Sequence, residues 1–156
     1  MNSEIFQDLA AQRGLIRANW ENLLRLERAI SPLANPDALV HLLDTTLDEI
    51  FRDLPQSSLR RYPIREPEPH CPCGHNPLLA YFGSGHQALR EALVMIQAGI
   101  PALDGNQRDE ALGCLEQVYG HISRREIESF CAVCQFRNVP HPAVATIPCP
   151  RVADRP

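Results

Sequence analysis

Apolar residues recur along most of the chain at steps of three and four, the spacing that places them on one side of an α-helix. This pattern predicts four helices, at about residues 3–29, 35–54, 77–98 and 106–135. No segment alternates between apolar and polar residues in the manner of a strand. The sequence therefore predicts an all-α protein.

Proline, asparagine and glycine mark the ends of these helices. Asn35-Pro36 and Asn76-Pro77 each combine a good N-cap residue with a proline suited to the first helical position. Gly99 and Pro101 are typical of the end of the third helix. Each of these signals agrees with the limits set by the apolar periodicity.

The connection at residues 55–75 holds five prolines and should be extended. Four amphipathic helices with one such long crossover predict an antiparallel four-helix bundle, with the Pro-rich crossover between the second and third helices. A chain of 156 residues is long enough for one domain with its own core. We assign residues 1–137 to that domain and residues 138–156 to an irregular Pro-rich C-terminal tail.

Net charge and composition indicate which partners and which cellular compartment to expect. A net charge of -4 and a pI near 5.8 argue against a nucleic-acid partner, because such proteins usually carry a basic face. No apolar stretch approaches the length needed to cross a membrane, and charges interrupt residues 1–20, so we expect a cytoplasmic protein. The six cysteines would then sit in a reducing compartment, where metal binding or redox chemistry is favoured over disulfides.

Two cysteine pairs are expected to converge in space. A short turn near Asp104 should fold the third and fourth helices into an antiparallel hairpin. Cys71 and Cys73 lie 31 to 33 residues before that turn, and Cys131 and Cys134 lie 27 to 30 residues after it. Because both helices rise by about 1.5 Å per residue, the four thiols should reach one end of the bundle.

Four thiolates in this arrangement suit a tetrahedral structural zinc ion. The spacing of Cys71-Pro72-Cys73 is tighter than the common C-x₂-C, so His70 or His75 is a possible substitute for one cysteine. The alternative for the same thiols is a reversible redox switch, since a helix N-terminus lowers a nearby thiol pKa.

Three further interpretations concern the second cysteine pair alone and the two cysteines outside the pairs. A thiol–disulfide oxidoreductase using Cys131 and Cys134 is a third hypothesis, although thioredoxin-like pairs open a helix and this pair ends one. Cys114 should be a small core residue. Cys149 should be a free thiol in the tail.

His86 lies on the apolar stripe of the third helix and, counted across the turn, lies level with His121. Small residues at Gly83, Gly85 and Gly120 fall near the same height. They would allow close helix packing around a hydrogen-bonded core histidine, or leave room for a small-molecule or haem pocket.

Helix one with Trp20-x-x-Leu23-Leu24, the Asn35-Pro36-Asp37 start and the segment Asn76-Pro77-Leu78-Leu79-Ala80-Tyr81-Phe82 resemble bacterial helical sensor domains. The family they resemble is the N-terminal domain of RsbR-type stressosome regulators. That resemblance implies a sensory or protein-binding bundle, dimeric and not an enzyme. The sequence also lacks the familiar motifs of nucleotide-binding enzymes, serine hydrolases and zinc proteases.

We therefore expect a non-catalytic regulatory or protein-interaction bundle with a structural zinc site, binding another protein or a second copy of itself. The alternative is a redox or small-ligand sensor, with the cysteine pairs or a His86 pocket that binds haem as its input.

Overall fold

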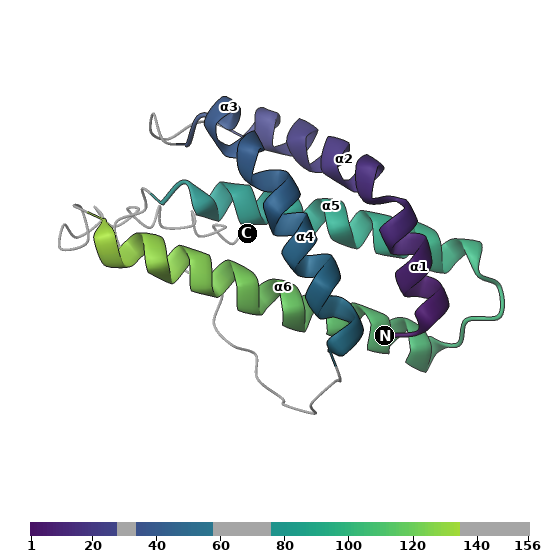
Figure 1. Ribbon diagram of the computed structural model, residues 1–156. Coiled ribbons are helices and arrows are strands. Elements are labelled where there is room, and N and C mark those ends of the chain that lie inside the picture. The colour runs from purple at the N-terminus through teal and green to yellow at the C-terminus, as the bar shows by residue number, and fades with distance from the viewer. Residues whose placement is uncertain (28–33, 58–75, 135–156) are drawn as a thin grey trace, which may run out of the picture.

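The computed structural model describes residues 1–27, 34–57 and 76–134, and all regular structure in these ranges is helical (Figure 1). The helices are α1 (Ser3–Ala11), α2 (Arg13–Leu26), α3 (Pro36–Leu39), α4 (Leu43–Asp53), α5 (Leu78–Gly99) and α6 (Gly105–Val133), with short 3-10 turns η2 (Val40–Leu42) and η3 (Leu54–Gln56). The all-α class is confirmed for these residues. The crossover and the C-terminal tail lie outside them.

The single helix expected at residues 3–29 is two helices, α1 and α2, which meet at Gln12. The backbone of Gln12 has φ -88° and ψ 7°, so it leaves the helical conformation for one residue. Its N–H still bonds to the carbonyls of Asp8 and Leu9, at 3.1 and 3.2 Å. The bend allows both segments to pack against α5. The helix ends at Leu26, and the expected extension to residue 29 runs outside the described residues.

The helix expected at residues 35–54 is likewise interrupted, by the 3-10 turn η2 between α3 and α4. Its predicted start is confirmed, because the Asn35 side chain accepts a hydrogen bond from the Asp37 N–H at 3.0 Å. A short turn does precede the last helix, but it spans residues 100–104 and so lies earlier than the predicted centre near Asp104. There Asp104 and Gln107 form a reciprocal capping box at the start of α6.

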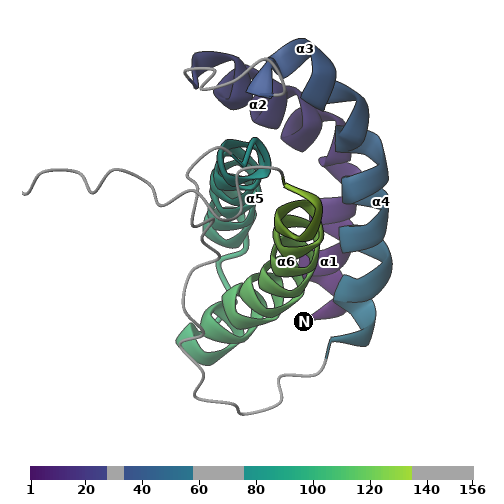
Figure 2. The same cartoon turned by 90° about the vertical axis from the view of Figure 1, so that its left-hand side faces the viewer.

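Helices α5 and α6 run side by side in opposite directions, and the other helices pack on this pair (Figures 1 and 2). The α2 helix lies along α5, and α4 reaches from α2 to α6. The buried residues form one core drawn from all of these helices. Its largest fully buried side chains are Trp20, Tyr81, Ile5, Leu9, Ile16, Leu24, Leu43, Leu47, Ile50, Leu54, Leu89 and Leu93.

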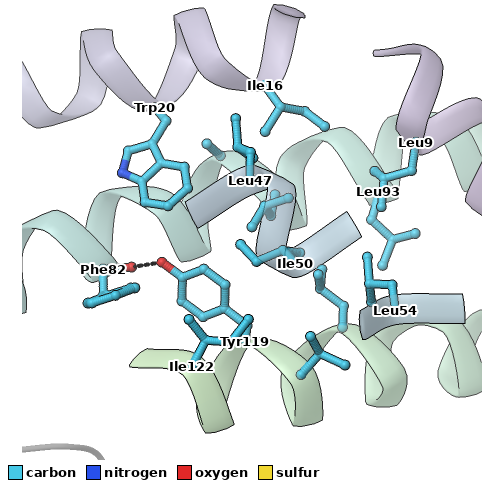
Figure 3. Close-up of a cluster of buried hydrophobic side chains, with 14 of the residues drawn as sticks. Leu9, Ile16, Trp20, Leu47, Ile50, Leu54, Phe82, Leu93, Tyr119 and Ile122 are labelled. Atoms are coloured by element: carbon cyan, nitrogen blue, oxygen red, sulfur yellow. Dashed lines mark hydrogen bonds between the residues drawn. The ribbon is translucent and has the colours of Figure 1, made fainter. Parts of the chain in front are cut away.

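Two aromatic side chains close on the backbone of α5 near the centre of this core (Figure 3). The Trp20 indole N–H donates to the Tyr81 carbonyl at 2.9 Å. The Tyr119 hydroxyl donates to the Phe82 carbonyl at 2.6 Å, the bond drawn in Figure 3. Gly85 makes the approach possible. A Cβ at this position would overlap the Trp20 ring and lie 2.5 Å from the Tyr119 hydroxyl oxygen.

Among the described helices, none combines the length and apolar character that a membrane crossing requires.

Gly85→Ala should lower the free energy of unfolding by about 1–3 kcal/mol, because the added methyl group must displace Trp20 and Tyr119. Gly83→Ala is the matched control, since nothing lies within 4 Å of its added Cβ. There the gain in helix propensity should stabilise the protein by about 0.5–1 kcal/mol. Urea denaturation of both variants measures the contrast, and equal effects would show that the close approach is not limiting.

Candidate functional site

The start of α5 and the end of α6 are joined by one buried side chain, Asn76. Its amide nitrogen donates to the Ile127 carbonyl at 3.2 Å and to the Cys131 sulfur at 3.3 Å. Its amide oxygen accepts a hydrogen bond from the Leu78 N–H at 2.9 Å, which confirms the Asn-Pro start of this helix. Asn76 is fully buried, so these bonds replace all of its hydration.

Both cysteines of the second pair lie at this end of the hairpin. Cys131 is in the last turn of α6, half-buried against the core, and Cys134 follows as the C-cap residue. The Cys134 N–H bonds to the Cys131 carbonyl at 3.3 Å. The helix thus brings Cys131 to the point where α5 begins, and it ends at Cys134.

The other predicted ligands, Cys71, Cys73, His70 and His75, lie outside the described residues. Within the ranges that the structure describes, no group of three or more His, Cys, Asp or Glu side chains could hold a metal ion. The four-cysteine zinc site therefore stays a prediction. Two of its predicted ligands, Cys131 and Cys134, lie in the described part of the chain.

His86 lies at the edge of the core, with its side chain 33% exposed. Its Nε2 atom is 2.6 Å from a carboxylate oxygen of Glu116, and its ring stacks on Tyr119 with 5.4 Å between ring centroids. The predicted neighbour, His121, is exposed on α6. The carboxylate that holds His86 was not among the predicted site residues.

The predicted pairing of His86 with His121 was wrong because the centre of the turn between the two helices was placed too late in the chain. The connection between α5 and α6 spans residues 100–104, so its midpoint is residue 102 and not Asp104. The residue of α6 that lies opposite a given residue of α5 is therefore earlier in the sequence than predicted. For His86, the residues nearby are Glu116 and Tyr119. The helix-end signals at Gly99 and at the Asp104 cap could have located this midpoint in the sequence.

Glu116 faces two positive or polar partners. The hydrogen bond with His86 is the main cause that lowers the pKa of the Glu116 carboxyl, and the positive charge of Arg90, whose Nε is 3.5 Å away, acts in the same direction. Partial burial opposes both. For Tyr119, burial raises the pKa well above its usual value, so the hydroxyl is a hydrogen-bond donor to the Phe82 carbonyl. These groups hold His86 in place between α5 and α6.

The remaining candidate residues are Cys114, Cys149 and His41. Cys114 is fully buried, as predicted for a small core residue. Cys149 lies outside the described residues. His41, on η2, is exposed.

Neither the scan against protein-family models nor the searches of curated proteins and of solved structures finds a match for this chain. The resemblance to RsbR-type domains accordingly stays a prediction, and functional assignment rests on the geometry described above.

Asn76→Ala should lower the free energy of unfolding by about 2–3 kcal/mol, since it removes a buried side chain whose hydrogen bonds cap the Leu78 N–H and reach the Ile127 carbonyl and the Cys131 sulfur on α6. The control is Asn35→Ala, which removes the same cap at an exposed Asn-Pro start and should cost about 1 kcal/mol. Thermal and urea unfolding of both variants give the comparison. Equal costs would show that the contacts of Asn76 with α6 contribute nothing.

A second prediction concerns pH. Because the pKa of Glu116 is lowered by folding, its contribution to stability is fully present above its usual value of 4.5 and is lost as the pH falls through the lower, folded value. The difference in unfolding free energy between wild type and Glu116→Gln should therefore shrink on acidification below that pH. Glu128→Gln removes the same charge from an exposed position on α6 and should show no such trend. A pH-independent difference for Glu116→Gln would contradict the pairing.

Proposed function

We propose that this chain is a non-catalytic regulatory domain that binds protein, built as an antiparallel four-helix bundle. A structural zinc ion closes its cysteine end. The ligands would be Cys71, Cys73, Cys131 and Cys134, with His70 or His75 able to replace one thiolate. The observation that carries the proposal is the hydrogen bond from Asn76 to the Cys131 sulfur, 3.3 Å long.

Covalent geometry supports the convergence of the two pairs. Cys73 precedes Asn76 by three residues, and three residues span at most about 11 Å. Since the side chain of Asn76 touches Cys131, covalent reach allows the proposed approach of Cys73 to Cys131.

A zinc ion at this place has a clear physical role. It would attach the Pro-rich crossover, which has few apolar side chains to bury, to the last turn of α6. Zn–S bonds of about 2.3 Å would then fix a segment that the hydrophobic core cannot. The ion would add to the hold that Asn76 exerts on the same two helices.

Ionic groups of the described helices support the non-catalytic part of the proposal. Arg17 on α2 bonds to Asp44 on α4, and the Arg125 guanidinium on α6 bonds to both carboxylate oxygens of Glu49 at 2.7 and 2.9 Å. These charges join neighbouring helices. His86 is likewise engaged by Glu116 and Tyr119, which favours a structural role over haem binding.

A redox sensor is the second candidate, and the same hydrogen bond favours it. That bond places the Cys131 thiol at the junction of α5 and α6, where a change in its oxidation state would act on both helices. Metal content separates the two functions.

Freshly purified protein should contain about one zinc ion per chain by elemental analysis, as expected for a single tetrahedral site. Cys131→Ser should lose that ion and lower the unfolding free energy by more than about 2 kcal/mol, because metal binding energy is folding energy. Cys134→Ser should behave in the same way.

Cys149→Ser is the control and should keep both the zinc and the stability. Removal of the metal with a chelator should lower the melting temperature of wild type and leave that of Cys131→Ser unchanged. Metal-free protein that forms a reversible disulfide under mild oxidants would favour the redox sensor, and metal-free protein with inert thiols would refute both.

A further inference from the structure

The last turn of α6 places Cys131 and Cys134 beside each other. Residues three apart along a helix share one face, with their Cα atoms about 5 Å apart and their Cβ atoms about 5–6 Å apart. Val133 is the last helical residue, and the Cys134 N–H still bonds to the Cys131 carbonyl at 3.3 Å. Because a disulfide needs Cα atoms about 4.4–6.8 Å apart, the backbone of this turn already suits one.

Both cysteines are also open to oxidants. Each carries a thiol in the structure and is partly exposed. Cys114, the other cysteine in the described ranges, is fully buried in the core. Since oxidation of a thiol requires access to its sulfur, an oxidant should act on the pair at the end of α6 before it acts on Cys114.

Closing a disulfide would change what Cys131 contacts. The Cβ atoms of a disulfide lie about 3.5–4.5 Å apart, so the two cysteines must approach each other by about 1–2 Å, and the Cys131 sulfur must turn toward Cys134. In the thiol form that sulfur lies 3.3 Å from the Asn76 amide nitrogen. Asn76 cannot follow it, because its side chain is fully buried and is held by the Leu78 N–H and the Ile127 carbonyl.

We propose that a peroxide oxidises Cys131 and Cys134 to a disulfide and that this reaction breaks the hydrogen bond between Asn76 and the Cys131 sulfur. One sulfur, having given up its proton, attacks a peroxide oxygen and becomes a sulfenic acid as the O–O bond breaks. The other sulfur, likewise deprotonated, displaces that hydroxyl group and forms the S–S bond. Two thiols and one hydrogen peroxide thus give one disulfide and two water molecules, and the peroxide takes up the two electrons that the sulfurs lose.

This disulfide rests on the redox sensor named as the second candidate function and specifies its chemistry. The bond lies within the pair on α6, and its effect is the loss of one contact between α5 and α6. The same two sulfurs are proposed zinc ligands, so a bound ion should protect them from the oxidant. The change stays at this end of the bundle, because Trp20 and Tyr119 hold the backbone of α5 beside Gly85.

Peptide mapping of the full chain tests which bond forms. Cleavage after Arg125 and Arg137 gives one tryptic peptide, residues 126–137, that carries Cys131 and Cys134 and no other cysteine. After treatment with a chelator and then with hydrogen peroxide, this peptide should be two hydrogen atoms lighter and should resist alkylation until it is reduced. Without the chelator, protein that holds zinc should keep both thiols.

The side-chain amide signals of Asn76 in the NMR spectrum of isotope-labelled protein test the second half of the proposal. They should shift on oxidation and return on reduction with dithiothreitol. Asn19 is the matched control, because its side-chain amide donates to Glu91 at 2.9 Å, away from the cysteines, and its signals should stay in place.

Four results would overturn the proposal: thiols that still alkylate fully after peroxide, a cross-link between peptide 126–137 and the peptide that carries Cys71 and Cys73, a disulfide that leaves the Asn76 signals unchanged, or a loss of helicity by circular dichroism on chelation alone. Protein that is purified without zinc and still forms the disulfide would refute the zinc site and leave this proposal standing.

Discussion

The architecture depends on the missing side chain of Gly85. Because α5 has no Cβ there, Trp20 from α2 and Tyr119 from α6 can reach its backbone, where they donate to the consecutive carbonyls of Tyr81 and Phe82. The Tyr81 hydroxyl in turn bonds to Thr46 on α4 at 2.9 Å. Buried hydrogen bonds of this kind specify geometry that apolar packing alone would leave variable. Three helices are thus held in fixed positions around α5.

The geometry at the end of α6 that carries Cys131 and Cys134 follows from these hydrogen bonds. Tyr119 sets the height of α6 against α5, and twelve residues further along α6, at Cys131, the same register brings the helix to Asn76. If α6 were displaced by one turn, about 5.4 Å, the Cys131 sulfur would no longer lie beside the Asn76 amide. The contacts of Trp20 and Tyr119 beside Gly85 and the contact of Asn76 with α6 therefore depend on the same alignment of the helices.

Local signals in the sequence predict the features that depend on neighbouring residues. The apolar periodicity locates the helices, and Asn35, Asn76 and Asp104 are found capping or starting helices as expected. The break at Gln12 was missed because neither proline nor glycine marks it, and packing of both segments on α5 imposes it. Glu116 was missed because the hairpin midpoint was taken two residues too late. The convergence of the four thiols depends on residues 71 and 73 and stays a prediction.

Helix α5 carries both of these contacts. Its N-terminal end meets Cys131 through Asn76, and nine residues further along, beside Gly85, Trp20 and Tyr119 reach its backbone. A metal ion at the cysteine end would therefore meet a helix whose position against α2 and α6 is already set by buried hydrogen bonds. Because the closeness of Trp20 and Tyr119 to Gly85 resists a shift of α5, the geometry favours a zinc ion that stabilises the bundle over one that moves its helices.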